Sequence, residues 1–261
     1  RSDIDMMQGG FGPLPIHMSG HEGLGQVISV GKEITDVRIG DFVATRGEPA
    51  YADVYPVRQH EYVVVSEASP KYILEPVACG VNCVMQAREE IAKRQGNGKR
   101  LLLMGSGFLA WVVYHTLQYF KMNFEITVVG RSNRDMWGGV LQQDFRGTFD
   151  VVIDLSSENM FDKDIYNNSA LLVAGVQKPT TTDFAHLLWK AYTVIFPSPR
   201  TDNFHHSMLL AKHLIESGKL TVDQFWSRGY NRNTEWKKAF SDATNRDRSY
   251  SRGYIYWPDR A

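Results

Sequence analysis

The apolar run Leu101-Leu102-Leu103-Met104 leads directly into Gly105-Ser106-Gly107-Phe108-Leu109-Ala110, and this stretch decides the fold that we predict. A short apolar run bounded by glycine is typical of a buried parallel strand. The first glycine permits a tight turn, and the second lets the backbone approach a pyrophosphate. A helix that starts after the turn directs its N-terminal N–H groups at such an anion. The stretch therefore predicts half of a dinucleotide site, with a purely structural turn as the alternative.

A second predicted strand, Glu125 to Val129, ends in Gly130-Arg131-Ser132-Asn133-Arg134. Sites for NAD usually carry an acidic residue at this point, where it binds the ribose 2′-hydroxyl. This chain has no acid there. Arg131 and Arg134 offer guanidinium groups and Ser132 offers a hydroxyl, a set that suits a 2′-phosphate. The sequence therefore favours NADP(H) over NAD.

Length and composition indicate a globular protein of one large or two modest domains, with 261 residues of which 43% are hydrophobic. Basic and acidic residues balance at 29 each, and no basic run occurs, so we expect no nucleic-acid partner and no membrane partner. No apolar segment has membrane-spanning length and no signal peptide is recognisable. Cys79 and Cys83 suggest buried reduced thiols, although both could share a helical face with Glu75. We therefore expect a cytoplasmic protein.

The remaining chain predicts strands on both sides of the glycine turn. Alternating residues before it predict an antiparallel β-rich region with strands at 26–31, 40–44 and 61–65. Apolar runs after it predict further buried parallel strands at 149–154, 170–175 and 192–196. The segment 135–148 is too short for two usual crossovers, so either one βα unit is trimmed or residues are missing. We favour missing residues, because a crossover normally needs a dozen or more residues. The last part predicts helices at 183–190 and 204–217, a helix capped by Thr234, and a final strand at 253–257.

The β-rich region carries a family pattern. Gly20-His21-Glu22-Gly23-Leu24-Gly25, then Val30-Gly31 and Gly40-Asp41-Phe42-Val43, resemble the zinc alcohol dehydrogenase signature of the medium-chain dehydrogenase/reductase superfamily. Leu24 departs from the smaller residue usual in that family. The resemblance implies an α/β protein with a GroES-like β-rich catalytic domain and a Rossmann doubly wound parallel sheet. It implies a catalytic domain at 1–80, an NADP-binding domain at 81–200, and a segment at 201–261 that completes the catalytic domain.

The resemblance also implies one catalytic zinc, which takes three protein ligands and keeps one position open. The implied ligands are His21, Glu75 and an exchangeable Glu22, together with a cysteine expected immediately before Arg1. Asp3 would orient His21, and Ser2 would pass the substrate proton toward solvent. Asp5 stands where some relatives have a relay histidine, so the outer half of that relay is not implied. Residues 45–60 contain no cysteine, so we expect no structural zinc.

The predicted function is an NADP(H)-dependent oxidoreductase that interconverts a carbonyl compound and an alcohol of polyol, sugar or amino-alcohol type. The expected catalytic residues are Ser2, His21 and Glu22. The expected cofactor-binding residues are Arg1, Gly105, Ser106, Gly107, Phe108, Leu109, Arg131, Ser132 and Arg134. A zinc-independent medium-chain quinone or enoyl reductase, and a non-catalytic NADPH-binding scaffold, are the alternatives. We also expect a homodimer or homotetramer that forms through an edge strand at 192–196.

Overall fold

The computed structural model describes residues 2–7, 19–156, 158–161, 163–175, 181–246 and 250–258, apart from the side chains of Ser2, Met6 and Arg134. The chain divides into two compact units. Unit 1 comprises Arg1–Pro76 and Met208–Ala261, and unit 2 comprises Val77–Ser207. Our sequence boundaries were 80 and 200. None of the helices in the described ranges combines the length and the apolarity that crossing a bilayer requires.

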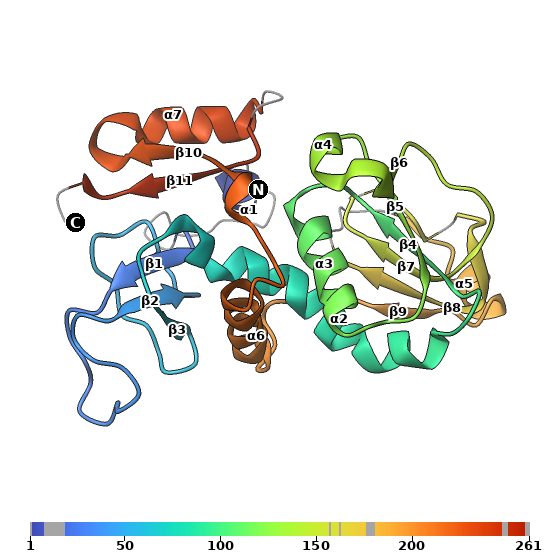
Figure 1. Ribbon diagram of the computed structural model, residues 1–261, viewed down its shortest axis with the longest axis horizontal. Helices are drawn as coiled ribbons and strands as arrows, with labels where there is room; N and C mark the ends of the chain where they lie inside the picture. Colours follow the sequence, from blue (N-terminus) through green and yellow to red (C-terminus); the bar gives the residue numbers. More distant parts are fainter. Residues whose placement is uncertain are drawn as a thin grey trace. The chain divides into compact units, whose positions relative to one another are not determined.

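Unit 2 contains a parallel six-stranded sheet (Figure 1). The strand order is β6-β5-β4-β7-β8-β9. Successive strands are added to one side of β4 up to β6 and to the other side from β7 onward. The boundary between β4 and β7 is therefore the switch point at which open α/β sheets bind ligands. The predicted Rossmann sheet is confirmed. Its strands are β4 (Arg100–Met104), β5 (Glu125–Val129), β6 (Leu141–Gln142), β7 (Phe149–Asp154), β8 (Tyr166–Ala174) and β9 (Thr193–Ile195).

The two faces of this sheet have separate hydrophobic cores because strand side chains alternate. Leu101 and Leu103 pack with residues of α2 (Leu74–Arg94) and α3 (Phe108–Tyr119). Leu102 and Met104 belong to the cluster on the other face, which includes residues of the neighbouring strands and of the segment 160–165. Gly80 lets α2 approach α3 closely, since an added Cβ would lie 2.7 Å from Val112. Both cysteines lie on α2 outside any disulfide, with Cys83 buried and Cys79 partly buried.

The short segment after β5 is a trimmed βα unit. It contains the one-turn helix α4 (Arg134–Trp137), the 3-10 turn η3 (Gly138–Val140) and the two-residue strand β6. A strand this short pairs with β5 through two residues, so a long crossover is not needed to place it. The next connection, 143–148, contains no helix. The sequence favoured missing residues, whereas the structure fits the other alternative, a trimmed unit.

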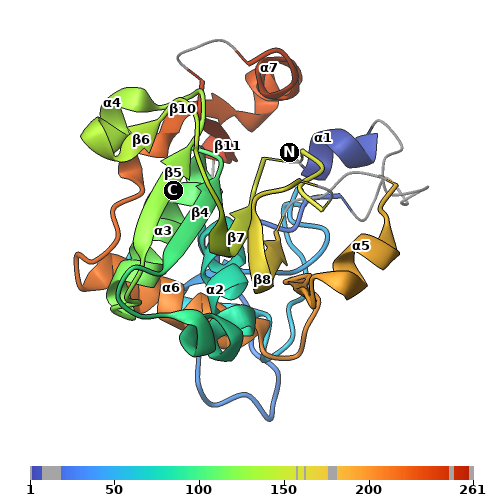
Figure 2. The same cartoon turned by 90° about the vertical axis from the view of Figure 1, so that its right-hand side faces the viewer.

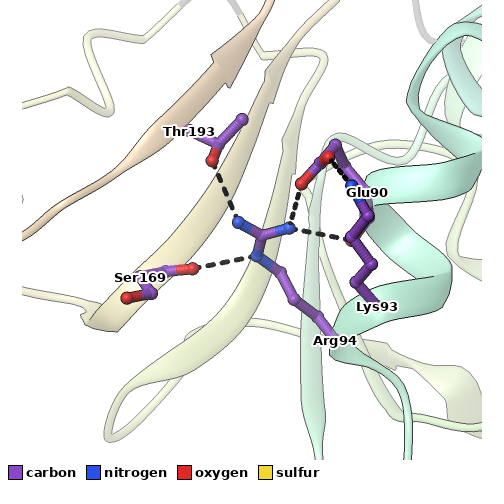
Figure 3. A network of polar contacts seen from close by, with 5 residues as sticks. All are labelled: Glu90, Lys93, Arg94, Ser169 and Thr193. Atoms are coloured by element: carbon purple, nitrogen blue, oxygen red, sulfur yellow. Dashed lines mark hydrogen bonds and ion pairs between the residues drawn. The ribbon is translucent and has the colours of Figure 1, made fainter.

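Arg94 fastens the end of α2 to the strands at the sheet edge (Figure 3). Its guanidinium donates to the carbonyl of Ser169 in β8 at 2.9 Å and to the hydroxyl of Thr193 in β9 at 2.9 Å. It also pairs with Glu90 at 2.6 Å, and Glu90 pairs with Lys93. The β9 edge is therefore held by side chains as well as by its ladder to β8. The helix α5 (Phe184–Trp189) precedes β9 in the chain, and Figure 2 shows it on the β8 side of the sheet.

The N-terminal part of unit 1 is an antiparallel three-stranded sheet, as we predicted for this region. Its strands are β1 (Gly23–Gln26), β2 (Phe42–Thr45) and β3 (Tyr62–Val65). The predicted strand at 26–31 is wrong, because β1 ends at Gln26. Beyond it, the Val27 amide donates to the Asp41 carbonyl and the Val27 carbonyl accepts from the Gly40 amide. Ile28 is 60% exposed, so the alternation there marks a surface segment rather than a paired strand. The chain also forms the helix α1 (Ser2–Met7) and the 3-10 turn η2 (Pro70–Tyr72).

The C-terminal part of unit 1 is a parallel pair of strands joined by a helix. The elements are α6 (Phe204–Glu216), η4 (Asp223–Phe225), β10 (Trp226–Asn231), α7 (Arg232–Thr244) and β11 (Arg252–Tyr256). Gly218 follows α6 with a φ of +68°, as expected of a residue that ends a helix. Thr234 is not the cap of α7. Asn231 is, because its side chain accepts from the Asn233 amide.

Candidate functional site

Three of the predicted metal ligands come together in unit 1. One ligand atom each from His21, Glu22 and Glu75 lies within 4.8 Å of the others. His21 and Glu22 immediately precede β1, and Glu75 belongs to the first turn of α2, where it is 3% exposed. Nitrogen and carboxylate oxygen donors in one cluster are a ligand set that zinc accepts.

Asp3 lies behind the His21 ring. Its Oδ1 atom is 3.5 Å from Nδ1 of His21, and its Oδ2 atom accepts a hydrogen bond of 3.1 Å from the Tyr51 hydroxyl. Burial is the main cause that raises the pKa of Asp3, and burial together with the Asp3 charge raises the pKa of Tyr51. A carboxylate that faces one imidazole nitrogen sets the ring orientation in which the other nitrogen binds a metal.

Tyr51 was not among our site residues, and packing is what places it there. Gly20 leaves room for the Tyr51 ring, since an added Cβ would lie 2.7 Å from it. The ring also meets Phe240 of α7 edge to face, with centroids 5.6 Å apart. The only sequence signal was the glycine that precedes His21, which we assigned to the family pattern alone.

Glu22 makes a strong contact that the sequence did not reveal. Its Oε2 atom lies 2.5 Å from an Arg252 guanidinium nitrogen, and the Arg252 guanidinium stacks on the Trp226 ring at 5.0 Å from the ring centroid. Burial by itself would raise the pKa of Glu22. Arg252 outweighs this effect, so the pKa is lowered and the carboxylate is charged. A buried carboxylate requires such a partner, but its identity depends on how β11 is placed.

The residues present fit a zinc ion. Asp3 Oδ1 is buried and makes no hydrogen bond in the described part of the chain, so its charge is directed at His21. His21 and Glu75 supply nitrogen and oxygen donors, and Glu22 supplies a further carboxylate whose Oε2 atom is paired with Arg252. Asp3, His21, Glu22, Tyr51 and Arg252 all line a cavity of about 1370 Å³ within unit 1, so the cluster is reachable by small molecules.

Of the other N-terminal site residues, the structure describes Ser2 only in part and Arg1 not at all. Ser2 begins α1, but its side chain and the whole of Arg1 lie outside the described residues. Asp5 is on the same helix and is half-buried. The structure therefore brings together Asp3, His21, Glu22 and Glu75, and it leaves the proposed proton path through Ser2 as a prediction.

The glycine turn in unit 2 has the local geometry that a pyrophosphate site needs. Gly105 adopts a φ of +123°, a backbone conformation that residues other than glycine rarely adopt. Gly107 is the N-cap residue of α3, and a Cβ added to it would meet open space. Phe108 is the first residue of α3 and is buried, and Leu109 follows it in the first turn. The backbone at Gly107 therefore faces space in which a ligand phosphate could approach the N-terminus of α3.

Ser106 ties the glycine turn to the end of β5. Its hydroxyl accepts from the Ser132 amide at 3.1 Å, and its carbonyl accepts from Asn133 and from the Trp137 indole, both at 3.0 Å. Gly130 makes this possible, because an added Cβ would lie 2.2 Å from the Ser106 hydroxyl oxygen. Hydrogen bonds thus link the glycine turn to the end of β5, and the Ser106 side chain makes one of them.

Arg131 extends from the end of β5 into solvent. Its side chain is 96% exposed and lies 4.0 Å from Glu158. Ser132 is exposed beside it, and the side chain of Arg134 lies outside the described residues. The structure therefore brings Arg131 and Ser132 to the carboxyl end of the β5 strand, next to the glycine turn.

Comparison with known proteins gives a family match for the first part of the chain and a limited match to one curated protein. Residues 1–73 match the family model of the alcohol dehydrogenase GroES-like domain. The mitochondrial enoyl-[acyl-carrier-protein] reductase of Bos taurus is 50% identical over 44 residues, which are 16% of this chain. The match covers only 12% of the length of that reductase.

Several solved structures share the fold over almost the whole chain. An alcohol dehydrogenase from Thermus sp. ATN1 has a TM-score of 0.74 at 15% identity, with 98% of this chain and 89% of that chain covered. A mycobacterial protein solved with NADPH has a TM-score of 0.71 at 17% identity, with coverages of 94% and 84%. Galactitol-1-phosphate dehydrogenase from Escherichia coli has a TM-score of 0.65 at 14% identity, with coverages of 94% and 86%. The GroES-like match thus covers the N-terminal part of the chain, and the solved structures share its overall fold.

Proposed function

We propose that the protein is an NADP(H)-dependent oxidoreductase that interconverts a carbonyl compound and an alcohol of polyol, sugar or amino-alcohol type. The observation that carries this proposal is the cluster of His21, Glu22 and Glu75 with Asp3 behind the imidazole. In the reducing direction the carbonyl carbon receives a hydride and the oxygen receives a proton, which gives the alcohol and NADP⁺. Zinc supplies a Lewis acid and NADPH supplies the hydride.

The residues of unit 1 have distinct roles in this proposal. His21 and Glu75 would hold the ion, and Asp3 would keep the His21 ring in the orientation that ligation requires. Tyr51 in turn holds Asp3 through its hydrogen bond. Because Tyr51 keeps its proton at physiological pH, it acts as a donor that fixes the carboxylate and does not compete for the ion.

The residues of unit 2 bind the cofactor in this proposal. The turn at Gly105 and Gly107 and the N-terminus of α3 would receive the pyrophosphate. Arg131 and Ser132 would receive the 2′-phosphate, since a guanidinium and a hydroxyl both donate to phosphate oxygens. One of the proteins with the same fold was solved with NADPH, which supports a nicotinamide cofactor here.

Replacing His21 with alanine tests the zinc-dependent mechanism. We expect the intact protein to contain near-stoichiometric zinc by elemental analysis. His21→Ala should lose the metal and lower carbonyl reduction by several orders of magnitude, while NADPH affinity stays within a few-fold because the glycine turn belongs to unit 2. His60→Ala, an exposed histidine of unit 1, is the matched control and should keep the metal. Undiminished reduction by metal-free protein would refute the mechanism.

A zinc-independent enoyl reductase is the second candidate, and the identity with the bovine enoyl reductase over 44 residues is what favours it. Its test uses chelator-treated protein, a 2-enoyl thioester and NADPH. Oxidation of NADPH that needs the thioester and survives metal removal would support this candidate. Oxidation that occurs only with carbonyl substrates and only with metal supports the alcohol dehydrogenase. A protein that binds NADPH and turns over neither substrate would be a scaffold.

A further inference from the structure

Glu22 stands between two groups that both attract a carboxylate. On one side is the metal cluster, in which a ligand atom of Glu22 lies within 4.8 Å of those of His21 and Glu75. On the other side is Arg252, whose guanidinium nitrogen is 2.5 Å from Oε2 of Glu22. Both side chains of this ion pair are largely buried, with 20% of Arg252 and 22% of Glu22 exposed. Water therefore screens the pair less than it screens a surface salt bridge.

Arg252 is held in place by more than its charge. Its guanidinium lies over the Trp226 ring, and its backbone carbonyl accepts a 3.0 Å hydrogen bond from Ser227. Trp226 and Arg252 are also partners in the register of β10 and β11. A planar guanidinium that is stacked and paired in this way is preorganised to hold a carboxylate in one orientation.

We propose that Arg252 competes with the metal for the Glu22 carboxylate and thereby sets the metal affinity of the His21–Glu75 cluster. Arg252 is then a positioning residue that acts through Glu22. This inference rests on the proposed zinc site. With Arg252 present, Glu22 balances the charge of the guanidinium and contributes little as a ligand. Without it, Glu22 is free to turn toward the ion and complete the ligand set.

A double-mutant cycle in the intact protein separates this competition from simple charge repulsion. Zinc affinity is measured by competition with a chromophoric chelator for wild type, Arg252→Met, Glu22→Gln and the double variant. Loss of a positive charge near a cation site strengthens metal binding whether or not Glu22 is a carboxylate. Release of Glu22 from Arg252 strengthens metal binding only when residue 22 is a carboxylate. We expect Arg252→Met to tighten zinc binding about 10-fold in the wild-type background, within the usual range for residues behind metal ligands, and by less than about 3-fold in Glu22→Gln.

Two further variants and a spectrum distinguish positioning from a structural role. Arg252→Lys keeps the charge without the planar guanidinium, so its zinc affinity should lie between those of wild type and Arg252→Met. Arg228→Met removes a different arginine of the same sheet, which pairs with Asp242 at 3.0 Å, and should leave zinc affinity unchanged. With Co²⁺ in place of zinc, Arg252→Met should change the visible absorption of the metal, because an additional ligand alters the coordination geometry. The same change should not occur in the double variant.

The outcomes separate the two proposals. A wild-type protein that binds neither Zn²⁺ nor Co²⁺ would overturn the zinc function itself. Normal binding with equal effects of Arg252→Met in both backgrounds would overturn the competition and leave the zinc site intact. Circular dichroism and NADPH binding report on folding. If Arg252→Met does not fold, the same cycle with Arg252→Gln decides the question by the same comparison.

Discussion

Removing the guanidinium of Arg131 should abolish most of the preference for NADPH. The side chain is 96% exposed and 4.0 Å from Glu158, so an interaction this open to water contributes little to folding. A hydrogen bond to a charged group contributes about 1.5–3 kcal/mol, which corresponds to about 10- to 150-fold in affinity. The exposure of Arg131 favours the lower end of this range, so we expect Arg131→Ala to bind NADPH about 10-fold more weakly. NADH lacks the 2′-phosphate, and its affinity should not change.

Fluorescence titration of both cofactors measures this effect. Arg200→Ala removes another exposed arginine of unit 2, beyond β9, and is the matched control. The preference of the wild type should shrink as salt concentration rises, because salt screens an exposed charge, whereas Arg131→Ala should show little salt dependence. Wild-type affinity of Arg131→Ala for NADPH, or equal affinity of the intact protein for NADPH and NADH, would refute the role that we assign to the β5 end.

Two further predictions concern stability and assembly. Burial would raise the pKa of Asp150, but hydrogen bonds from the Arg100 amide and from Lys99, both 2.9 Å, outweigh burial and lower the pKa. The charged carboxylate therefore stabilises the fold fully above about pH 4, the pKa of an unfolded aspartate. This contribution is lost as pH falls through the lower pKa of the folded state. Asp150→Asn should therefore flatten the fall in the free energy of unfolding below about pH 4, as urea denaturation can measure, and an unchanged slope would contradict this. We also expect a homodimer or homotetramer by light scattering, because in the described residues β9 pairs only with β8, and the neighbouring Leu188 and Trp189 are 81% and 87% exposed. Replacing both of these apolar residues with lysine should shift the mass toward the monomer, whereas a monomeric wild type at micromolar concentration would argue against this interface.

Local patterns in the sequence were enough to predict the parallel sheet of unit 2. The run at Leu101 and the glycines at 105 and 107 predicted a strand, a turn and a helix, and each of these depends on residues that are close in the chain. Apolar runs predicted the other long strands for the same reason. The spacing of the family pattern was also sufficient to select His21, Glu22 and Glu75, which the structure brings within 4.8 Å of one another.

The sequence was less informative where a residue needs a distant partner. Residues 26–31 alternate in polarity like a strand, but a strand also needs a neighbouring segment to pair with. The ladder of β1 with β2 ends at Gln26. The short segment 135–148 allowed two interpretations until β6 was seen to pair with β5. Pairing between strands depends on the register and on the path of the chain, and periodicity carries neither.

The electrostatic surroundings of the site were decided by tertiary structure alone. Tyr51 reaches Asp3 across 48 residues of sequence, and Arg252 reaches Glu22 across 230. No local spacing encodes such contacts, because they form only when β11 and the Tyr51 loop pack against the segment that carries His21. The sequence by itself determined which ligand types are present. Packing determined which charges face them, because a buried carboxylate takes the nearest cation that the folded chain provides.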